Sequence, residues 1–516
     1  MATINPGWNF LLLALAACAT ATAHAAPLRG PNALTPAQAR EDFELAVDAV
    51  EAGLPEVAWF QSKHDWQAAQ QRARQALPAV KDGAGLFRIL RPLLSRIGEG
   101  HLSLQRSASM QADDRLAQGL LPIDIRWTEA GAWVTAGWDA AAAIPVGTRL
   151  LAVDGQAVGE LLRESMSALS HDGMIPTGVM RDLDGAGYAR VRHWMRGGAA
   201  HYRLQLQDGA GHVSELVAGG IAASARPAEA RPARPALATL QWLDDHTARL
   251  TVPTFSNRRY REAGSDYKTV IRQLFASLQA RGARCLILDL RENGGGSEGN
   301  ENELFSFLVR EPMRKYAAVE ARGAAVSVRD AHGRLYATEV YDEEERRRQV
   351  PLPTGQLSRL NVPPEGLMSH WEPRPDVFTG RLIVLAGGNT FSGAAELSSM
   401  LYHARRGLFV GEEVAGAHAG NTSGYRWEIA LPNSRMQLHL PLLRFRFAWD
   451  ELPLGRGVPP HCAVAPALPN SPQDRALEVA WALAALPWTP GDPPPCPAGS
   501  LVDELLAPPQ GADGAE

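Results

Sequence analysis

The residues best placed for nucleophilic chemistry lie in the stretch GGNTFSGAAELSSML, residues 387–401. Ser392 follows a short apolar run and precedes a helical pattern, so we expect it at a strand-to-helix junction. A serine there can cap the helix with its side-chain oxygen, because the first amides of a helix lack partners. The same amides and the helix dipole stabilise an anion, so the position also suits a nucleophile. A nucleophile further requires a base and oxyanion-binding donors, which other parts of the chain must supply.

A second stretch, CLILDLRENGGGSEGN at residues 285–300, is a candidate source of those donors. A nearly continuous apolar strand opens there into Gly294, Gly295 and Gly296. Glycines let the backbone approach a ligand closely and leave N–H groups free to point at it. The Gly-Lys-Ser/Thr of a phosphate loop and the spaced glycines of a dinucleotide site are both missing from this stretch. The pattern therefore indicates either an oxyanion cradle or an ordinary turn after a strand.

Changes of pattern along the chain predict several domains, as a length of 516 residues also suggests. Residues 34–97 are rich in helical periodicity, and residues 118–218 show short alternating strands with Gly-centred turns. Residues 223–236 are an aperiodic Ala/Pro/Arg stretch typical of a linker. We therefore predict an export signal (1–26), a helical domain (27–115), a β-rich domain (116–222), a linker (223–237), an α/β domain (238–488) and a disordered tail (489–516).

The N-terminal stretch WNFLLLALAACATATAHAAP indicates export. Its apolar core is too short to span a bilayer and is followed by a small-x-small motif, Ala-His-Ala at 23–25. An alternative is the lipobox-like Leu-Ala-Ala-Cys at 15–18, which would place a lipid anchor on Cys18. We therefore expect a periplasmic or secreted protein, or a lipoprotein anchored through Cys18.

Composition and cysteine positions narrow the classes of partner. The chain is 45% hydrophobic and 21% charged with a net charge of −5, and it has no clustered basic patch, which argues against nucleic acid. No later apolar run is long enough for a membrane helix. Cys285 lies in a predicted buried strand, whereas Cys462 and Cys496 flank Pro-rich loops. In an oxidising compartment Cys462 and Cys496 could pair; the alternative is two free loop thiols.

Taken together, segments from about residue 35 to 470 resemble the C-terminal processing (tail-specific) and tricorn-core family of serine peptidases. The matching pieces occur in the family's order, and they include IGEGHLSL, IPVGTRLLAVDGQAV, LILDLRENGGG, TFSGAAE and VGEEVAGAHAGNTSGY. The resemblance implies an α/β multi-domain protein. It would combine an N-terminal helical domain, a PDZ-like β-rich domain and an α/β catalytic domain of the crotonase/ClpP-like type.

The same resemblance implies roles for individual residues. Ser392 occupies the nucleophile segment, although it stands four residues before the next Glu where many family members have three. The oxyanion donors would be the backbone N–H groups of Gly295 and Gly393. Gly294 or Gly296 would replace Gly295 if the register is shifted by one.

The base is expected to be a histidine. One branch of the family uses a Lys after the Ser, but no Lys follows Ser392 here; the lysines are Lys63, Lys81, Lys268 and Lys315. The tricorn-like branch uses a His from the upstream Gly-His segment, which is His101 in this chain. Imidazole suits the task because its pKa lies near neutrality. His418 is the alternative base, and either His could instead be a structural or solvated residue.

A third group would orient the base. The resemblance to the tricorn-like branch points to Glu451, with Asp450 beside it. Both could also be ordinary exposed loop acids. Glu99 and Ser103 flank His101 and are alternative helpers.

The function implied is acyl transfer from peptides or unfolded proteins by a serine-type peptidase that needs no cofactor. Metal-binding spacings such as His-Glu-x-x-His and Cys-x-x-Cys are missing from the sequence. The alternatives are an esterase with the same nucleophile, or an inactive relative that binds peptides or apolar ligands, for example by strand addition to a PDZ-like domain. Relatives that assemble into compartments also suggest a homo-oligomer. The long polar stretch 311–378, between the glycine loop and Ser392, is a candidate lid or substrate-shaping insertion.

Overall fold

The computed structural model describes residues 32–226, 237–330, 332–359, 370–468, 471, 473–486 and 496. The predicted export signal with Cys18, most of the predicted linker, and the predicted tail apart from Cys496 lie outside the described residues. Within the described part of the chain, no helix is both long and apolar enough to cross a membrane.

Helices form the N-terminal part of the molecule. Helix α1 begins at Pro36, directly after Thr35, whose side chain and that of Gln38 form a reciprocal capping box. Its apolar face packs into the main hydrophobic core together with α2 and α3. The elements of this part are α1 (Pro36–Gly53), α2 (Lys63–Ala76), α3 (Gly83–Ser95), β1 (Ser103–Gln105) and α4 (Ala108–Arg115).

A β-rich unit follows, with a core of its own. Its sheet has the strand order β2-β3-β4-β6-β7, every neighbouring pair is antiparallel, and β5 pairs with β4. The strands are β2 (Ile123–Thr128), β3 (Gly131–Gly137), β4 (Arg149–Val153), β5 (Gln156–Ala157), β6 (His201–Gln207) and β7 (Val213–Gly219). The helices are α5 (Val158–Ala168), α6 (Thr177–Leu183) and α7 (Gly187–Arg196).

The α/β part is built on a six-stranded sheet with the order β22-β19-β18-β10-β9-β8. All neighbours are parallel except β8 and β9, and β10 and β18 are buried along most of their length, as expected for a sheet covered on both faces. The strands are β8 (Thr239–Trp242), β9 (Thr247–Thr251), β10 (Cys285–Asp289), β18 (Arg381–Ala386), β19 (Leu408–Gly411) and β22 (Cys462–Ala463).

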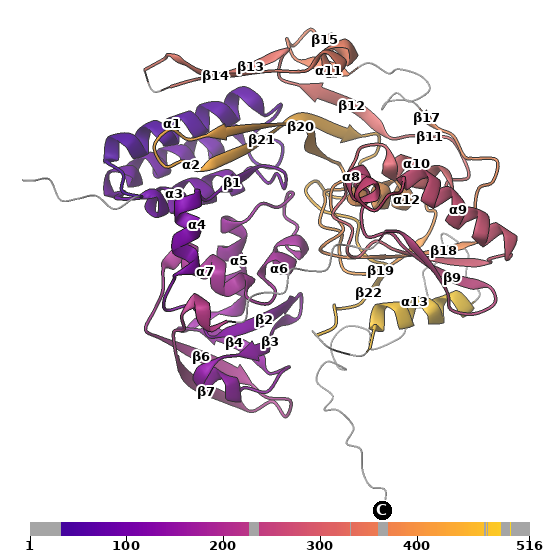
Figure 1. The fold of residues 1–516 in the computed structure, drawn as a ribbon, viewed down its shortest axis with the longest axis horizontal. Helices are drawn as coiled ribbons and strands as arrows, with labels where there is room; N and C mark the ends of the chain where they lie inside the picture. The colour runs from indigo at the N-terminus through magenta and orange to yellow at the C-terminus, as the bar shows by residue number, and fades with distance from the viewer. Residues whose placement is uncertain are drawn as a thin grey trace, which may run out of the picture.

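Helices cover both faces of this sheet. Helix α13 packs its apolar side chains against one face, over a cluster that includes Cys285 and Ile383. The opposite face belongs to the main core, where α9 and α12 lie (Figure 1). The helices are α8 (Asn257–Glu262), α9 (Tyr267–Ala280), α10 (Asn300–Ser306), α12 (Gly393–His403) and α13 (Arg475–Ala485).

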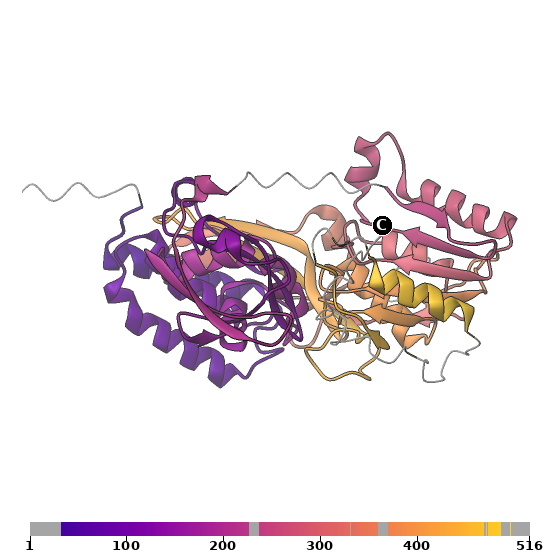
Figure 2. The ribbon, with the colours of Figure 1, turned by 90° about the horizontal axis from the view of Figure 1, so that it is seen from below.

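A third sheet joins the two halves of the molecule. The long hairpin of β20 (Gly420–Ala430) and β21 (Gln437–Phe447) reaches from the α/β part towards α1, as the orange strands of Figures 1 and 2 show. Strand β21 pairs with β1, which immediately follows the His101 loop, so that Ser103 lies opposite His439. Segments predicted as separate domains therefore share one sheet.

The candidate lid region 311–378 contributes to that third sheet and does not stand free as a flap. Strand β12 (Tyr316–Ala321) pairs with β21, and the neighbouring hairpin reaches α1, where the Arg329 amide donates to Asp48. The remaining elements are β11 (Met313–Arg314), β13 (Ala325–Arg329), β14 (Leu335–Val340), α11 (Glu343–Arg348), β15 (Gln349–Pro351), β16 (Leu357–Arg359) and β17 (His370–Trp371).

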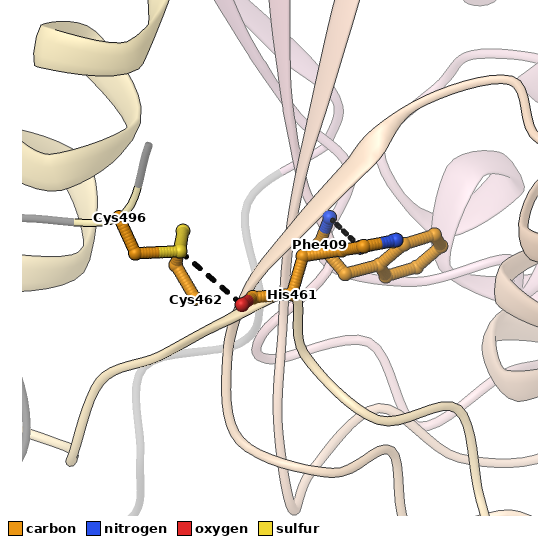
Figure 3. The surroundings of a disulfide bond; sticks show 4 residues. All are labelled: Phe409, His461, Cys462 and Cys496. Atoms are coloured by element: carbon orange, nitrogen blue, oxygen red, sulfur yellow. Dashed lines mark hydrogen bonds between the residues drawn. A yellow bond between two sulfur atoms is a disulfide. The ribbon is translucent and has the colours of Figure 1, made fainter. Parts of the chain in front are cut away.

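A disulfide joins Cys462 and Cys496, the pairing that the sequence left open (Figure 3). Cys462 lies at the edge of the parallel sheet, next to His461, whose Nδ1 accepts a hydrogen bond from the Phe409 amide at 3.0 Å. Cys285 is buried and free. The bond therefore ties a residue of the C-terminal tail to the edge of the parallel sheet.

Removing this disulfide is expected to lower stability measurably. A cross-link between residues 34 apart restricts the unfolded chain, so the double variant Cys462→Ser/Cys496→Ser should lose about 2–4 kcal/mol of unfolding free energy. Urea unfolding with and without a reductant measures it. Reductant should bring the wild type to the stability of the double variant and leave the double variant unchanged. Equal stability of the wild type and the double variant in the absence of reductant would contradict the prediction.

Candidate active site

Ser392 occupies the N-cap position of α12 in a backbone conformation that non-glycine residues rarely adopt. Its φ and ψ are +53° and −128°. Such a conformation costs energy and persists only where the surrounding structure holds it, often at functional sites. The side chain makes no capping hydrogen bond. Its Oγ instead lies 3.1 Å from Nε2 of His101, so the prediction that Ser392 caps its helix with its side chain was wrong.

The turn before Ser392 explains how that conformation is held. Strand β18 ends at Ala386, and the buried Thr390 closes the turn by accepting from the Gly387 amide and donating to the Leu290 carbonyl. The Phe391 amide then donates to the Asn293 carbonyl. These bonds tie the serine turn directly to the glycine loop that follows β10.

His101 comes from the other half of the molecule, on the loop between α3 and β1. Its ring stacks on Phe391 with centroids 4.7 Å apart. Burial lowers the pKa of His101 to about 4, against the opposite pull of the Glu396 carboxylate. The imidazole is therefore neutral at pH 7, with Nε2 able to accept the hydroxyl proton of Ser392. Its Nδ1 is buried without a hydrogen-bond partner.

The glycine loop approaches the serine closely. Gly295 has φ of +93°, and a Cβ added there would lie 2.7 Å from Ser392 Cβ and 2.9 Å from the Gly393 nitrogen. The Gly295 N–H donates to Asn293 Oδ1 at 2.9 Å, whereas Gly296 lines the cavity with Ser392 and Gly393. Gly393 is the first residue of α12, whose amide the helix itself leaves unpaired. Gly296 and Gly393 thus both line the cavity beside Ser392.

Substituting Gly295 with alanine is expected to inactivate the site. The new methyl group would overlap Ser392 and Gly393, and the positive φ would add strain. Because a misplacement of about 1 Å can cost about 10²-fold in rate, we expect at least that loss in hydrolysis. Gly294→Ala is the matched control, because an added Cβ there meets no atom within 4 Å. Equal rates for the two variants would contradict the prediction.

Two other residues singled out in the sequence lie away from this pair. His418 Nε2 is 3.2 Å from Glu451 Oε1, and the same oxygen is 3.1 Å from Nδ1 of His403. His403 is the last residue of α12, so this cluster lies at the opposite end of the helix, about 16 Å along its axis from Ser392. In this arrangement Glu451 does not orient His101, and His418 is not within reach of Ser392.

The alternative helpers also point elsewhere. Glu99 is buried and accepts hydrogen bonds from the amide and the hydroxyl of Thr422, at 3.1 and 2.6 Å. Burial raises the pKa of Glu99, and the nearby Asp172 raises it further. Ser103 is the first residue of β1, paired with β21, and Asp450 is exposed. Glu99 therefore anchors the His101 loop to β20 and does not contact the ring.

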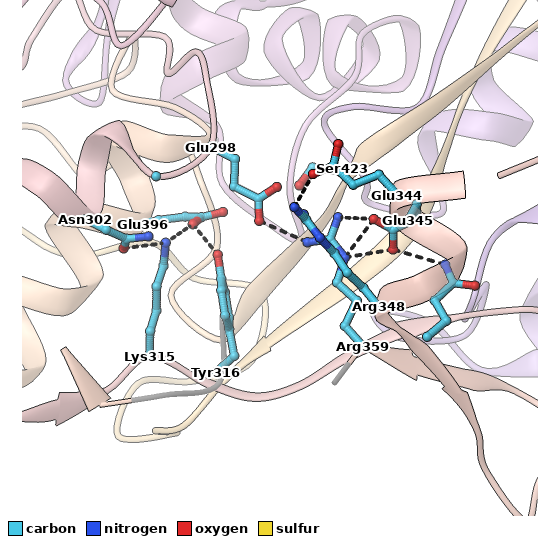
Figure 4. Close-up of polar contacts among 12 residues, drawn as sticks. Glu298, Asn302, Lys315, Tyr316, Glu344, Glu345, Arg348, Arg359, Glu396 and Ser423 are labelled. Carbon is cyan, nitrogen blue, oxygen red and sulfur yellow. Dashed lines mark hydrogen bonds and ion pairs between the residues drawn. The ribbon is translucent and has the colours of Figure 1, made fainter. Parts of the chain in front are cut away.

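A cavity of about 600 Å³ opens beside Ser392 and His101. Its wall includes aromatic and charged side chains that the sequence did not reveal, among them Tyr316 and Arg359 from the 311–378 region. Figure 4 shows Arg359 between the carboxylates of Glu345 and Glu298. Another cavity, of about 560 Å³, lies at the carboxyl ends of β9, β10 and β18, but its lining includes neither Ser392 nor His101.

A buried charged cluster around Lys315 and Glu396 reaches the wall of this cavity (Figure 4). Lys315 Nζ is 2.8 Å from Glu301 and 2.6 Å from Glu396, which lies in the first turn of α12. Glu396 also accepts hydrogen bonds from Tyr316 and Asn421. Sequence reasoning missed this cluster because its members are far apart in the chain and none belongs to a local motif.

Among the residues that the structure describes, no group of three or more His, Cys, Asp or Glu side chains is arranged to hold a metal ion. The groups gathered at Ser392 include its own hydroxyl, the His101 imidazole and the backbone of Gly296 and Gly393. That combination is suited to acyl transfer through a serine nucleophile.

Comparison with known proteins agrees with this chemistry. Residues 246–464 match the family model of peptidase family S41. The chain contains a peptidase family S41 domain. This match agrees with the predicted resemblance to tail-specific and tricorn-like serine peptidases, and the mixed α/β multi-domain architecture agrees with the predicted fold class. No curated protein matches the chain.

Solved structures share the fold of this chain. The crystal structure of mature CPAF is 15% identical over 83% of this chain and 93% of that chain, with a TM-score of 0.57. Mature CPAF complexed with lactacystin is 14% identical over 83% of this chain and 94% of that chain, with a TM-score of 0.56. At such identities the likeness supports the fold alone.

Proposed function

We propose that this S41 protein hydrolyses peptide bonds with Ser392 as nucleophile and His101 as base. The observation that carries the proposal is the 3.1 Å contact between Ser392 Oγ and His101 Nε2, made by a serine held at positive φ. A nucleophile within hydrogen-bond reach of a neutral imidazole is the arrangement that serine hydrolases require.

In this mechanism His101 takes the hydroxyl proton as Ser392 attacks the peptide carbonyl. The tetrahedral oxyanion lies against the Gly393 amide and a second amide from the glycine loop. Gly296 is the better placed of the loop amides because Asn293 occupies the Gly295 N–H, although a rotation of Asn293 would free Gly295. His101 then protonates the leaving amine, and water releases the acyl group.

Burial and a nearby carboxylate act in opposite directions on the proton transfer to His101. His101 must become cationic during the reaction, and burial opposes that charge. The Glu396 carboxylate favours the charged imidazole. Burial acts to raise the pKa of Glu396, but the neighbouring Lys315 outweighs burial and lowers that pKa. Glu396 thus takes part of the role that the sequence assigned to Glu451.

The substrates we propose are peptides or unfolded segments of exported proteins. The disulfide between Cys462 and Cys496 supports an oxidising compartment, where such bonds persist. We further propose that the β-rich unit is PDZ-like and can hold a peptide by strand addition. Periplasmic or secreted location, a lipid anchor at Cys18 and homo-oligomerisation remain predictions.

A ligand-binding protein without catalytic activity is the competing proposal. The observation that favours it is the Gly295 amide, the oxyanion donor that the sequence predicted, which donates to Asn293 Oδ1 at 2.9 Å instead. An inactive protein would keep the cavity but would not acylate.

Labelling with a fluorophosphonate decides between the two. We expect the probe to modify wild-type protein at Ser392, located by mass spectrometry of peptides, and to leave Ser392→Ala unlabelled. Turnover of peptide against ester substrates then separates a peptidase from an esterase. A folded wild type that takes no label would favour the binding protein.

A further inference from the structure

A segment of the β-rich unit holds the loop that carries His101. Residues 170–173 of this segment contact the loop at alternate backbone positions, on both sides of the histidine. The three contacts are Gly173 N to Gly98 O at 2.9 Å, Gly100 N to Asp172 Oδ1 at 2.7 Å, and Ser170 Oγ to Leu102 O at 2.6 Å. The histidine backbone is thus fixed from outside its own domain.

Asp172 is the central member of this set. Its side chain is 1% exposed, and its two oxygens serve two different parts of the molecule. Oδ1 accepts from the Gly100 amide, directly before His101, and Oδ2 accepts from the Ala417 amide at 3.1 Å, in the loop after β19 of the catalytic part. Only a carboxylate offers an acceptor to both amides, since an amide side chain of the same shape has one acceptor and one donor.

Packing makes the histidine sensitive to this bridge. A Cβ added at Gly100 would lie 2.6 Å from the Phe391 ring and 2.9 Å from Asp172 Oδ1, so Gly100 is confined between the two side chains. Phe391 precedes Ser392, and its ring carries the stacked His101. A shift of Gly100 therefore changes the position of the imidazole relative to the serine hydroxyl.

We propose that Asp172 is a positioning residue for His101, through which the β-rich unit completes the active site of the catalytic part. The proposal rests on the function proposed above, in which His101 is the base. Asp172 is buried at a domain boundary, near the acidic Glu99. A buried charge without hydrogen-bond partners is costly, and the positioning role explains why a carboxylate is nevertheless kept there. Among the described residues no side chain hydrogen-bonds to the His101 Nδ1, so the backbone contacts of its loop and the stack on Phe391 set the orientation of the ring.

The test compares Asp172→Asn with Asp42→Asn in the full chain. Asp42 is a matched control because it is also fully buried and also accepts from backbone amides, those of Asn433 and Ser434, at a different domain contact. Reaction with a fluorophosphonate is followed over a range of concentrations, which separates reversible binding (KI) from the chemical step (kinact). Thermal unfolding of both variants measures the purely structural cost.

We expect Asp172→Asn to lower kinact by about 10- to 100-fold with KI changed less than about twofold, because only the proton-transfer geometry is altered. Asp42→Asn should lose similar stability and keep the wild-type kinact. If Asp172→Asn does not fold, Ser170→Ala, which removes the contact to Leu102, should still lower kinact relative to Asp42→Asn.

The outcomes distinguish this proposal from the function on which it rests. In one outcome His101→Ala abolishes labelling, but Asp172→Asn labels as fast as Asp42→Asn. The positioning role is then wrong and the catalytic pair stands. The same conclusion holds if Ser170→Ala has to replace Asp172→Asn. If His101→Ala labels at the wild-type rate, both proposals are overturned. If kinact falls equally in Asp172→Asn and Asp42→Asn, lost stability accounts for the slower labelling, and the positioning role is also overturned.

Discussion

Replacing His101 with alanine is expected to lower kcat/KM for peptide hydrolysis by about 10⁴-fold or more, as removal of a catalytic base does in other serine hydrolases. The reason is geometric. His101 Nε2 lies 3.1 Å from Ser392 Oγ, and its depressed pKa keeps it neutral and able to accept a proton at pH 7. The measurement is steady-state hydrolysis of a fluorogenic peptide library by folded wild type and variant, alongside fluorophosphonate labelling.

His418→Asn is the matched control for this loss. His418 is as deeply buried as a core residue, but its Nε2 contacts Glu451 near the far end of α12. We expect less than about a tenfold change in kcat/KM, together with some loss of stability. A larger fall for His418→Asn than for His101→Ala would reverse the assignment of the base.

Replacing Lys315 with methionine is expected to cost about 3–5 kcal/mol of unfolding free energy, because it leaves two buried carboxylates without their shared cation. Burial alone would lower the pKa of Lys315, but Glu301 and Glu396 raise it above its usual value, so the ammonium is charged. Burial raises the pKa of Glu301, whereas that of Glu396 is lowered despite burial, chiefly by Lys315. After the substitution at least one of these carboxyl groups must take up a proton on folding.

Chemical denaturation of Lys315→Met measures the cost, with the exposed Lys268→Met as control, which should change stability by less than about 0.5 kcal/mol. The double variant Lys315→Met/Glu301→Gln removes one of the stranded charges and should recover a substantial part of the loss. Lys315→Met with wild-type stability would show that the cluster does not hold its charges as described.

Local sequence patterns predicted the parts of the site that depend on a few adjacent residues. The apolar run before Ser392 and the helical spacing after it placed the serine at the end of β18, directly before α12, as the structure has it. The glycines after β10 were expected to bring backbone amides close to a ligand, and Gly295 and Gly296 do lie against the serine turn and the cavity. Short-range sterics and periodicity decide such features, so they are visible in the sequence.

Relations across the chain could not be predicted in this way. His101 and His418 were both candidate bases, and only the pairing of β1 with β21 and the packing of Gly100 against Phe391 bring His101 to the serine. The direction of the Ser392 side chain likewise depends on a partner 291 residues away. A sequence pattern records neither contact, since it contains no information on which distant loops meet.

The amino-acid sequence by itself determined the strand-turn-helix that presents Ser392 and the glycine loop, and its motifs predicted the resemblance to peptidases that the family match supports. The tertiary structure alone decided which histidine faces the serine and which carboxyl groups lie near it. It placed Glu451 beside His403 and His418, Asp172 on the amide of Gly100 before His101, and Glu396 in contact with Lys315. The physical reason is that local propensity fixes an element within a few residues, whereas burial and hydrogen bonding between distant segments fix where each side chain can act.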